Sequence, residues 1–139
     1  MEKNNMCNIR QAGSLEYIEY IHNVLSAYKV IAVVGYSKNI HRASHHCVSF
    51  LRERGFTVFP VNPTLEKTQE HGVVYPDLQS LPKKPDIVNV FRRSDAVMPI
   101  AQEAINIKTK LVWLQDGVIN EEAGKKIREA GIDLIMDDC

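Results

Sequence analysis

The residues with the clearest potential for chemistry are the basic ones near the start of the chain. Between Glu19 and Glu53 there is no acidic residue. The cations of this stretch are Lys29, Lys38, Arg42 and Arg52, and its histidines are His22, His41, His45 and His46. An acid-free stretch with several cations suits an anionic ligand, although it is equally compatible with a solvated basic face.

One segment of this stretch has features of a phosphate-binding loop. Gly35 follows the continuous apolar run 30–34, and a helix is expected to begin near Ser44, a plausible N-cap. A glycine there lets a ligand approach the backbone, and the start of the helix offers N–H groups and a positive dipole to a phosphate. The segment has neither the GxGxxG fingerprint of dinucleotide-binding domains nor a P-loop motif, because the next glycine is Gly55.

A second segment bears on the kind of nucleotide. NAD-binding domains usually place an acidic residue at the end of the second strand, where it binds the ribose 2′-hydroxyl. Asn62 and Pro63 occupy that position here. A nucleotide with an extra phosphate on its ribose tolerates this change better, with Lys38, Arg42 or Lys67 as the pairing cation. The Asn-Pro pair is equally compatible with a simple turn.

Two further loops bring polar side chains to the ends of predicted strands. Arg92 and Arg93 are adjacent, and either could clamp a phosphate or pair with a carboxylate. Neighbouring side chains diverge, so we expect only one of the two to face a ligand. Gln115 suits hydrogen bonding to an amide-containing ligand, whereas Asp116 suits either a general base or a solvated surface position.

The histidines and cysteines form no recognisable metal or nucleophile motif. His45 and His46 are adjacent, so on a helix they diverge by about 100°, and no other His or Cys stands at ligand spacing. Cys47 falls on the inner face of the same helix, where a buried structural thiol is the usual outcome. We therefore predict neither a metal site nor catalytic residues.

The elements that must position these residues follow from hydrophobic periodicity, which alternates between helical and extended. Helices are predicted over 15–28 with Ser14 as cap, from Ser44 to Gly55, over 95–107 with its regular part beginning near Pro99, and from Asn120 to Gly131. Strands are predicted over 30–34, 56–61, 87–91, 111–114 and 132–136, with a short edge strand at 72–75 and a helical turn at 77–81. This order predicts an α/β fold: a Rossmann-like, three-layer, doubly wound parallel β-sheet in a single domain. In such a sheet ligands bind beyond the carboxyl ends of the strands, where the loops described above would meet.

Composition limits the class of protein. The 139 residues, 45% hydrophobic and 24% charged, fit one globular domain over 14–139 that follows a polar tail at 1–13. Seventeen basic and 17 acidic residues give a net charge of zero, which argues against binding of nucleic acid or a membrane surface. The sequence has no apolar run of membrane-spanning length, no signal peptide and only scattered cysteines, so we expect a cytoplasmic protein with reduced thiols.

Several segments together resemble the small stand-alone CoA-binding proteins of bacteria and archaea, which are similar to the CoA-binding domain of the succinyl-CoA synthetase alpha subunit. The matching segments are IAVVGYS (31–37), the arginine and serine of HRAS (41–44), GFTVFPVNP (55–63), VYPDLQSLP (74–82), PDIVNVFRRS (85–94), KLVWLQDGV (110–118) and NEEAGKKIREAGIDLIMDDC (120–139). The resemblance implies a Rossmann-like domain whose small-molecule ligand is coenzyme A or an acyl-CoA.

The resemblance also implies site residues. The phosphates of CoA would lie by Gly35, Tyr36, Ser37, Lys38 and Ser44, the adenosine would be bordered by Asn62 and Pro63, and the rest of the ligand would be lined by Phe91, Arg92, Arg93 and Gln115. The chain departs from the family at Ala43, where proline is usual, and at Asp138, where arginine is frequent. The catalytic phosphohistidine of the synthetase lies in a further domain that has no counterpart in this sequence.

Three functions follow from these observations. The first is non-catalytic binding of CoA or acyl-CoA by a stand-alone domain, in the role of a sensor or a subunit. The second is a nicotinamide-nucleotide-binding oxidoreductase component, which the missing glycines and the missing acidic residue disfavour. The third is a scaffold that has kept the fold and lost the ligand. Whether a protein partner or a second copy of the chain is involved stays open.

Overall fold

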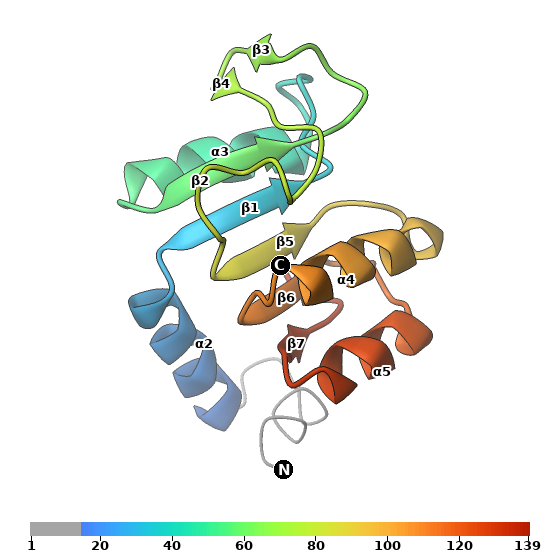
Figure 1. The fold of residues 1–139 in the computed structure, drawn as a ribbon. Helices are drawn as coiled ribbons and strands as arrows, with labels where there is room; N and C mark the ends of the chain where they lie inside the picture. Colours follow the sequence, from blue (N-terminus) through green and yellow to red (C-terminus); the bar gives the residue numbers. More distant parts are fainter. Residues whose placement is uncertain (1–14) are drawn as a thin grey trace.

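The computed structural model describes residues 15–139, and these form a five-stranded parallel sheet with helices on both faces (Figure 1). The strands of the sheet are β1 (Val30–Val34), β2 (Thr57–Val61), β5 (Ile87–Val90), β6 (Leu111–Leu114) and β7 (Asp133–Ile135). The helices are α2 (Leu15–Ala27), α3 (Ala43–Glu53), α4 (Val97–Asn106), α5 (Glu121–Glu129) and the 3-10 turn η1 (Ser94–Ala96). The predicted α/β, Rossmann-like class is confirmed.

The order of the strands determines where a ligand can bind. The sheet runs β2-β1-β5-β6-β7, and every adjacent pair is parallel. The chain moves from β1 outward to β2, then crosses back to β5 on the other side of β1. The connections after β1 and after β5 therefore leave the sheet in opposite directions, which opens a crevice at the carboxyl ends of these two strands.

Each face of the sheet has its own hydrophobic core. On one face, α4 and α5 contribute Ala101, Ala104 and Ile127, which pack against Val88 and Val112 of the sheet. The other face is covered by α2 and α3, and the hydrophobic core on this face is a separate cluster of buried residues. The three central strands, β1, β5 and β6, are largely apolar because both of their faces are covered, as the apolar runs in the sequence predicted.

The connection after β2 differs from its prediction. Thr68–Gln69 (β3) and Gly72–Val73 (β4) form a small antiparallel hairpin outside the main sheet, and Tyr75 makes an isolated parallel bridge with Val61. The predicted edge strand 72–75 is therefore split between two partners. The predicted helical turn 77–81 is wrong: Asp77 accepts hydrogen bonds from the backbone and side chain of Ser80, which forms a turn without helix.

The predicted helix ends agree at α5 and not at α3. The Asn120 side chain accepts a hydrogen bond from the Ala123 N–H and caps α5, as predicted. The regular part of α4 begins at Val97, two residues before Pro99 and directly after the 3-10 turn. The cap of α3 is Arg42 and not Ser44, which lies inside the first helical turn. The predicted cap Ser14 of α2 lies outside the described residues.

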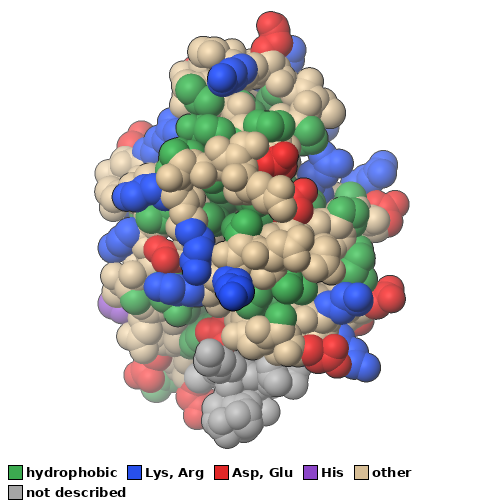
Figure 2. All heavy atoms as spheres, in the orientation of Figure 1, with side chains coloured by type: hydrophobic (Ala, Val, Ile, Leu, Met, Phe, Trp, Pro, Cys, Tyr) green, Lys and Arg blue, Asp and Glu red, His purple; other side chains and the backbone are tan. Residues whose placement is uncertain are grey.

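The charged side chains follow the balanced composition. On the face shown in Figure 2, Lys and Arg side chains alternate with Asp and Glu, and no large area of one sign appears. Within residues 15–139, none of the helices has the length and apolar character needed to cross a bilayer.

Candidate functional site

Three pockets that share lining residues lie near the loops after β1 and β2 and on the face of the sheet that α2 and α3 cover. The first, here called the loop pocket, has a volume of about 470 Å³ and is lined by the loop after β1, the start of α3, Asn62, Leu65 and Phe91. The second, the side pocket, is about 430 Å³ and shares Asn62 and Leu65 with the loop pocket. The third, the apolar pocket, is about 680 Å³ and shares Ala43 and Phe91 with the loop pocket. The shared residues make each pocket a neighbour of the loop pocket.

Gly35 brings the ends of β1 and β5 into close approach. Its φ is +89°, a left-handed conformation that favours glycine, and a Cβ at this position would lie 2.5 Å from the carbonyl oxygen of Phe91. The Gly35 N–H donates to the carbonyl of Val61, so the same residue also joins the end of β2. This position therefore requires a residue without a side chain because the backbone of Phe91 approaches it, whereas the approach of a ligand to Gly35 stays a prediction.

The start of α3 presents backbone donors to the loop pocket. Ala43 and Ser44 are the first two residues of the helix, so their N–H groups have no carbonyl one turn earlier, and no described residue accepts from them. The side chain of Ser44 is buried, and its hydroxyl oxygen accepts from the N–H of Ser37 at 3.0 Å. Ser44 therefore shapes the loop from within the first turn instead of capping the helix. Lys38 and Arg42 are exposed at the rim.

The aromatic ring of Tyr36 supports the loop from below and is not part of its open surface. Tyr36 is fully buried, and its hydroxyl shares a hydrogen bond of 2.7 Å with His71 Nδ1. The pKa of Tyr36 is raised, first by burial and then by the charge of Glu70, so the hydroxyl stays protonated. Of the predicted contact residue Tyr36, the backbone alone borders the loop pocket.

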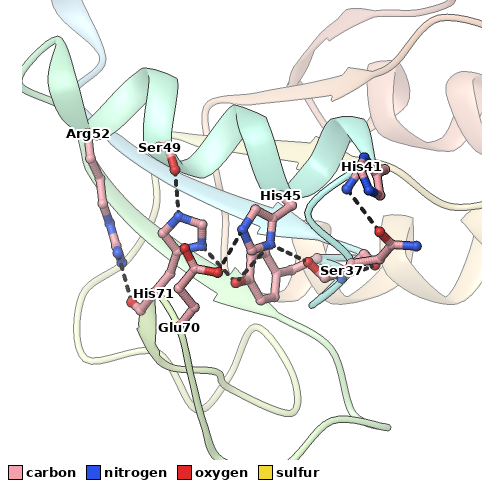
Figure 3. Close-up of polar contacts among 9 residues, drawn as sticks. Ser37, His41, His45, Ser49, Arg52, Glu70 and His71 are labelled. Atoms are coloured by element: carbon pink, nitrogen blue, oxygen red, sulfur yellow. Dashed lines mark hydrogen bonds and ion pairs between the residues drawn. The ribbon is translucent and has the colours of Figure 1, made fainter.

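A histidine pair extends this support from α3 to the hairpin (Figure 3). His45 Nδ1 lies 3.0 Å from the carbonyl oxygen of Ser37, and His45 Nε2 lies 3.3 Å from a carboxylate oxygen of Glu70. His71 Nε2 lies 2.6 Å from the Ser49 hydroxyl. Burial, followed by the nearby His45 and Arg52, lowers the pKa of His71, which favours the neutral ring. The pair connects the loop after β1 to the β3–β4 hairpin, which lies beyond α3 and β2 in the chain.

The same side chains are the one place where the described residues gather metal-ligand atoms. His45, Glu70 and His71 each offer an atom, and these atoms lie within 4.8 Å of one another. Both ring nitrogens of His71 already have hydroxyl partners, from Tyr36 and Ser49, so an ion would have to displace one of them. The arrangement is thus satisfied as a hydrogen-bond network. Sequence spacing missed it, because His45 and His71 are far apart in the chain.

Asn62 joins the first two loops. Its side-chain amide donates to the Tyr36 carbonyl at 2.8 Å, and its Oδ1 accepts from the N–H of Thr64 at 2.9 Å and from the Thr64 hydroxyl at 2.7 Å. The polar atoms of this side chain are thus bonded within the protein, and Asn62 also lines both the loop pocket and the side pocket. Pro63 is exposed beside it, and Lys67 lines the side pocket.

The two adjacent arginines separate, as the sequence predicted. Arg92 is half-buried and lies against the loop after β1, because a Cβ on Gly35 would be 3.0 Å from Arg92 Cδ. Within residues 15–139 it forms no ion pair. Arg93 points away: its side chain is 84% exposed and lies 3.3 Å from a carboxylate oxygen of Asp95. Of the pair, Arg92 is the one that lies against Gly35, although it does not itself line the loop pocket.

Gln115 lies at the floor of the apolar pocket with a partner that the sequence analysis missed. Its amide nitrogen donates to Asn89 Oδ1, and Asn89 in turn donates to the sulfur of Cys47 at 3.5 Å. A buried asparagine within the apolar strand Ile87–Val90 was a visible signal of such a site. Cys47 is half-buried and lines this pocket, and burial raises the pKa of its thiol to about 11. The predicted structural thiol is thus not enclosed in the core but borders a pocket, and its raised pKa disfavours the thiolate.

Comparison with known proteins identifies the family. The profile of the family described as "CoA binding domain" matches residues 29–139, and the chain belongs to that family. The chain is 37% identical over 119 residues to the uncharacterized protein YneT of Bacillus subtilis (strain 168), covering 86% of this chain and 87% of that protein.

Solved structures agree with this assignment. The fold matches a hypothetical protein from Pyrococcus horikoshii OT3 with a TM-score of 0.85 and 33% identity, over 94% of this chain and 90% of that chain. It also matches a Thermus thermophilus protein, cell-free ID.343, with a TM-score of 0.83 and 36% identity, over 87% of this chain and 91% of that chain. The resemblance inferred from the sequence motifs is therefore confirmed at the level of the family.

Proposed function

We propose that this protein binds coenzyme A or an acyl-CoA non-covalently, with the ligand extended along the three connected pockets. The observation that carries the proposal is the loop pocket, where the unbonded N–H groups of Ala43 and Ser44 meet the side-chain-free floor at Gly35. Such a helix start is suited to a phosphate, because its donors and its dipole both favour negative charge. Membership of the CoA binding domain family supplies the class of ligand.

The arrangement of the pockets suggests the direction of the ligand. The pyrophosphate lies in the loop pocket, which Lys38 and Arg42 line, and Arg92 reaches it from beside Gly35. The adenosine occupies the side pocket, where Lys67 can pair with the phosphate on the ribose. The pantetheine arm then passes Phe91 toward Gln115 in the apolar pocket. Asn62 at the end of β2 offers no carboxylate to a ribose hydroxyl, which favours this ligand over NAD.

The proposal assigns no turnover to the protein's own side chains. The thiol nearest to the path, Cys47, has a pKa raised to about 11 and is therefore a poor nucleophile at neutral pH. A sensor or subunit role follows from binding without reaction, and a cytoplasmic location suits a chain with few, scattered cysteines. Incubation of the protein with acetyl-CoA should release no more free CoA than buffer does.

Paired arginine variants test the binding site. Arg92→Ala should weaken CoA binding by about 1.5–3 kcal/mol, roughly tenfold to a hundredfold, because a charge-assisted phosphate bond is lost. Arg93→Ala is the matched control, since its side chain is exposed and pairs with Asp95. Isothermal titration at low salt with CoA and NAD measures both. Equal affinities for the two variants, or tighter binding of NAD than of CoA, would refute the assignment.

A further inference from the structure

The apolar pocket is larger than a free thiol requires. Its volume of about 680 Å³ falls within the range of small-molecule sites, and it lies between α2, α3 and the sheet. Its walls include Ile21 and Leu25 of α2 and Phe50 and Leu51 of α3, all of them apolar. Phe50 is 51% exposed, and the guanidinium of Arg54 lies over its ring at 3.6 Å from the centroid.

This pocket begins where the loop pocket ends. Ala43 and Phe91 line both, so a ligand with its phosphates at the start of α3 reaches the apolar pocket directly. The departure of this chain from the family at Ala43, where proline is usual, falls at this junction. A linear group that follows the phosphates into the apolar pocket would pass by these two residues.

The floor of the apolar pocket contains an unsatisfied acceptor. Gln115 is 7% exposed, and its Oε1 has no hydrogen-bond partner within the described residues. A buried carbonyl oxygen without a hydrogen-bond donor costs free energy. A ligand N–H that donates to this oxygen would therefore make the binding free energy more favourable. The amide groups of a pantetheine arm are donors of this kind. The polar floor thus fits the arm, and the apolar walls beyond it fit something without polar atoms.

Helix α2 (Leu15–Ala27) supplies part of those walls, although it precedes residues 29–139, which the family model matches. From the apolar walls and the polar floor of this pocket we infer that the ligand of this protein is a CoA thioester with an apolar acyl chain of several carbons, and that the chain occupies the apolar pocket between α2 and α3. This inference rests on the proposed function, because the acyl chain is placed by the CoA moiety.

A series of thioesters tests the inference on the unmodified protein. Isothermal titration with CoA, acetyl-CoA, butyryl-CoA and hexanoyl-CoA should show affinity rising about threefold for each added methylene, since each one leaves water for an apolar wall. Between acetyl-CoA and hexanoyl-CoA the dissociation constant should fall on the order of a hundredfold. If CoA binds and the affinity does not depend on chain length, the inference is overturned and the proposed function stands. If no member of the series binds, both fail.

Two variants on one helix locate the chain. Ile21→Trp fills the apolar pocket and should lower the affinity for hexanoyl-CoA relative to CoA by at least about tenfold, because the gain of several methylenes is lost. Ile18→Trp is the matched control: Ile18 is 50% exposed on the same helix and does not line the pocket. Urea unfolding curves of both variants serve as the check that each one folds. An unchanged ratio for Ile21→Trp would place the acyl chain elsewhere and overturn the inference.

Discussion

Replacing Gly35 with alanine tests whether the floor of the loop pocket depends on a missing side chain. Gly35 has a φ of +89°, so alanine there adopts a left-handed conformation that costs roughly 1–2 kcal/mol. The new Cβ would also stand 2.5 Å from the Phe91 carbonyl oxygen, which must move by roughly 0.9 Å to reach an ordinary contact at 3.4 Å. Overpacking of this kind costs about 1–3 kcal/mol.

The chain contains a matched control for this substitution. Gly55 has a φ of +92°, and a Cβ there would meet nothing within 4 Å. Both variants gain about 0.4–1 kcal/mol from the stiffer unfolded chain. Gly55→Ala should therefore destabilise the protein by about 1 kcal/mol or less, and Gly35→Ala by about 2–4 kcal/mol. The difference isolates the steric contact between the ends of β1 and β5.

Urea unfolding at neutral pH measures the two free energies, and titration with CoA measures the consequence for the site. Because relief of the contact moves the Phe91 carbonyl or the loop after β1, Gly35→Ala should also weaken CoA binding, whereas Gly55→Ala should not. Equal destabilisation by the two variants would show that the close approach is not tight and would refute the reasoning.

Two further predictions concern ionisable side chains. The pKa of His71 is lowered from its ordinary value of 6.5, first by burial and then by His45 and Arg52, so the unfolded state takes up protons before the folded one. The stability contribution of this neutral histidine is complete above pH 6.5 and should decline as the pH falls through the lowered pKa. The free energy of unfolding of His71→Gln, measured in urea, should therefore depend less on pH than that of the unchanged protein. The same pH dependence in both proteins would contradict the assignment. The thiol of Cys47, with a pKa of about 11, should be alkylated by iodoacetamide at pH 8 much more slowly than the exposed Cys139, as peptide mass spectrometry can measure; comparable rates would show that the apolar pocket does not protect it.

The sequence predicted the part of the fold that depends on local patterns. The continuous apolar runs of β1 and β5 require cover on both faces, and this requirement alone indicates a parallel sheet between two helix layers. Gly35 and Asn120 were also identified correctly, because a strand-end glycine and a helix-capping asparagine act within a few residues of their own position. The motifs around Gly35, Asn62 and Arg92 were sufficient to identify the family.

Errors arose where a side chain forms a hydrogen bond to a nearby residue other than the bond expected from its position. Ser44 has the side chain of a cap, but the loop after β1 folds back so that its hydroxyl binds the Ser37 N–H, and the helix begins earlier. The segment 77–81 has the composition of a helical turn, yet Asp77 closes it by accepting from Ser80. In both cases a side-chain hydrogen bond competed with the helix for the same backbone, and spacing along the chain does not reveal which one prevails.

The residue types at the site were thus determined by the sequence, and their roles by the tertiary structure. Arg92 and Arg93 are equivalent in the sequence, and only the packing of β5 against β1 puts one beside Gly35 and the other into solvent. The pairing of His45 with His71 and the unsatisfied oxygen of Gln115 likewise exist only after distant elements meet. Periodicity reports which face of an element is buried, because burial repeats with the geometry of one helix or strand. It carries no information about which side chains from different elements come to share a pocket, since that depends on the order and spacing of the strands in the sheet.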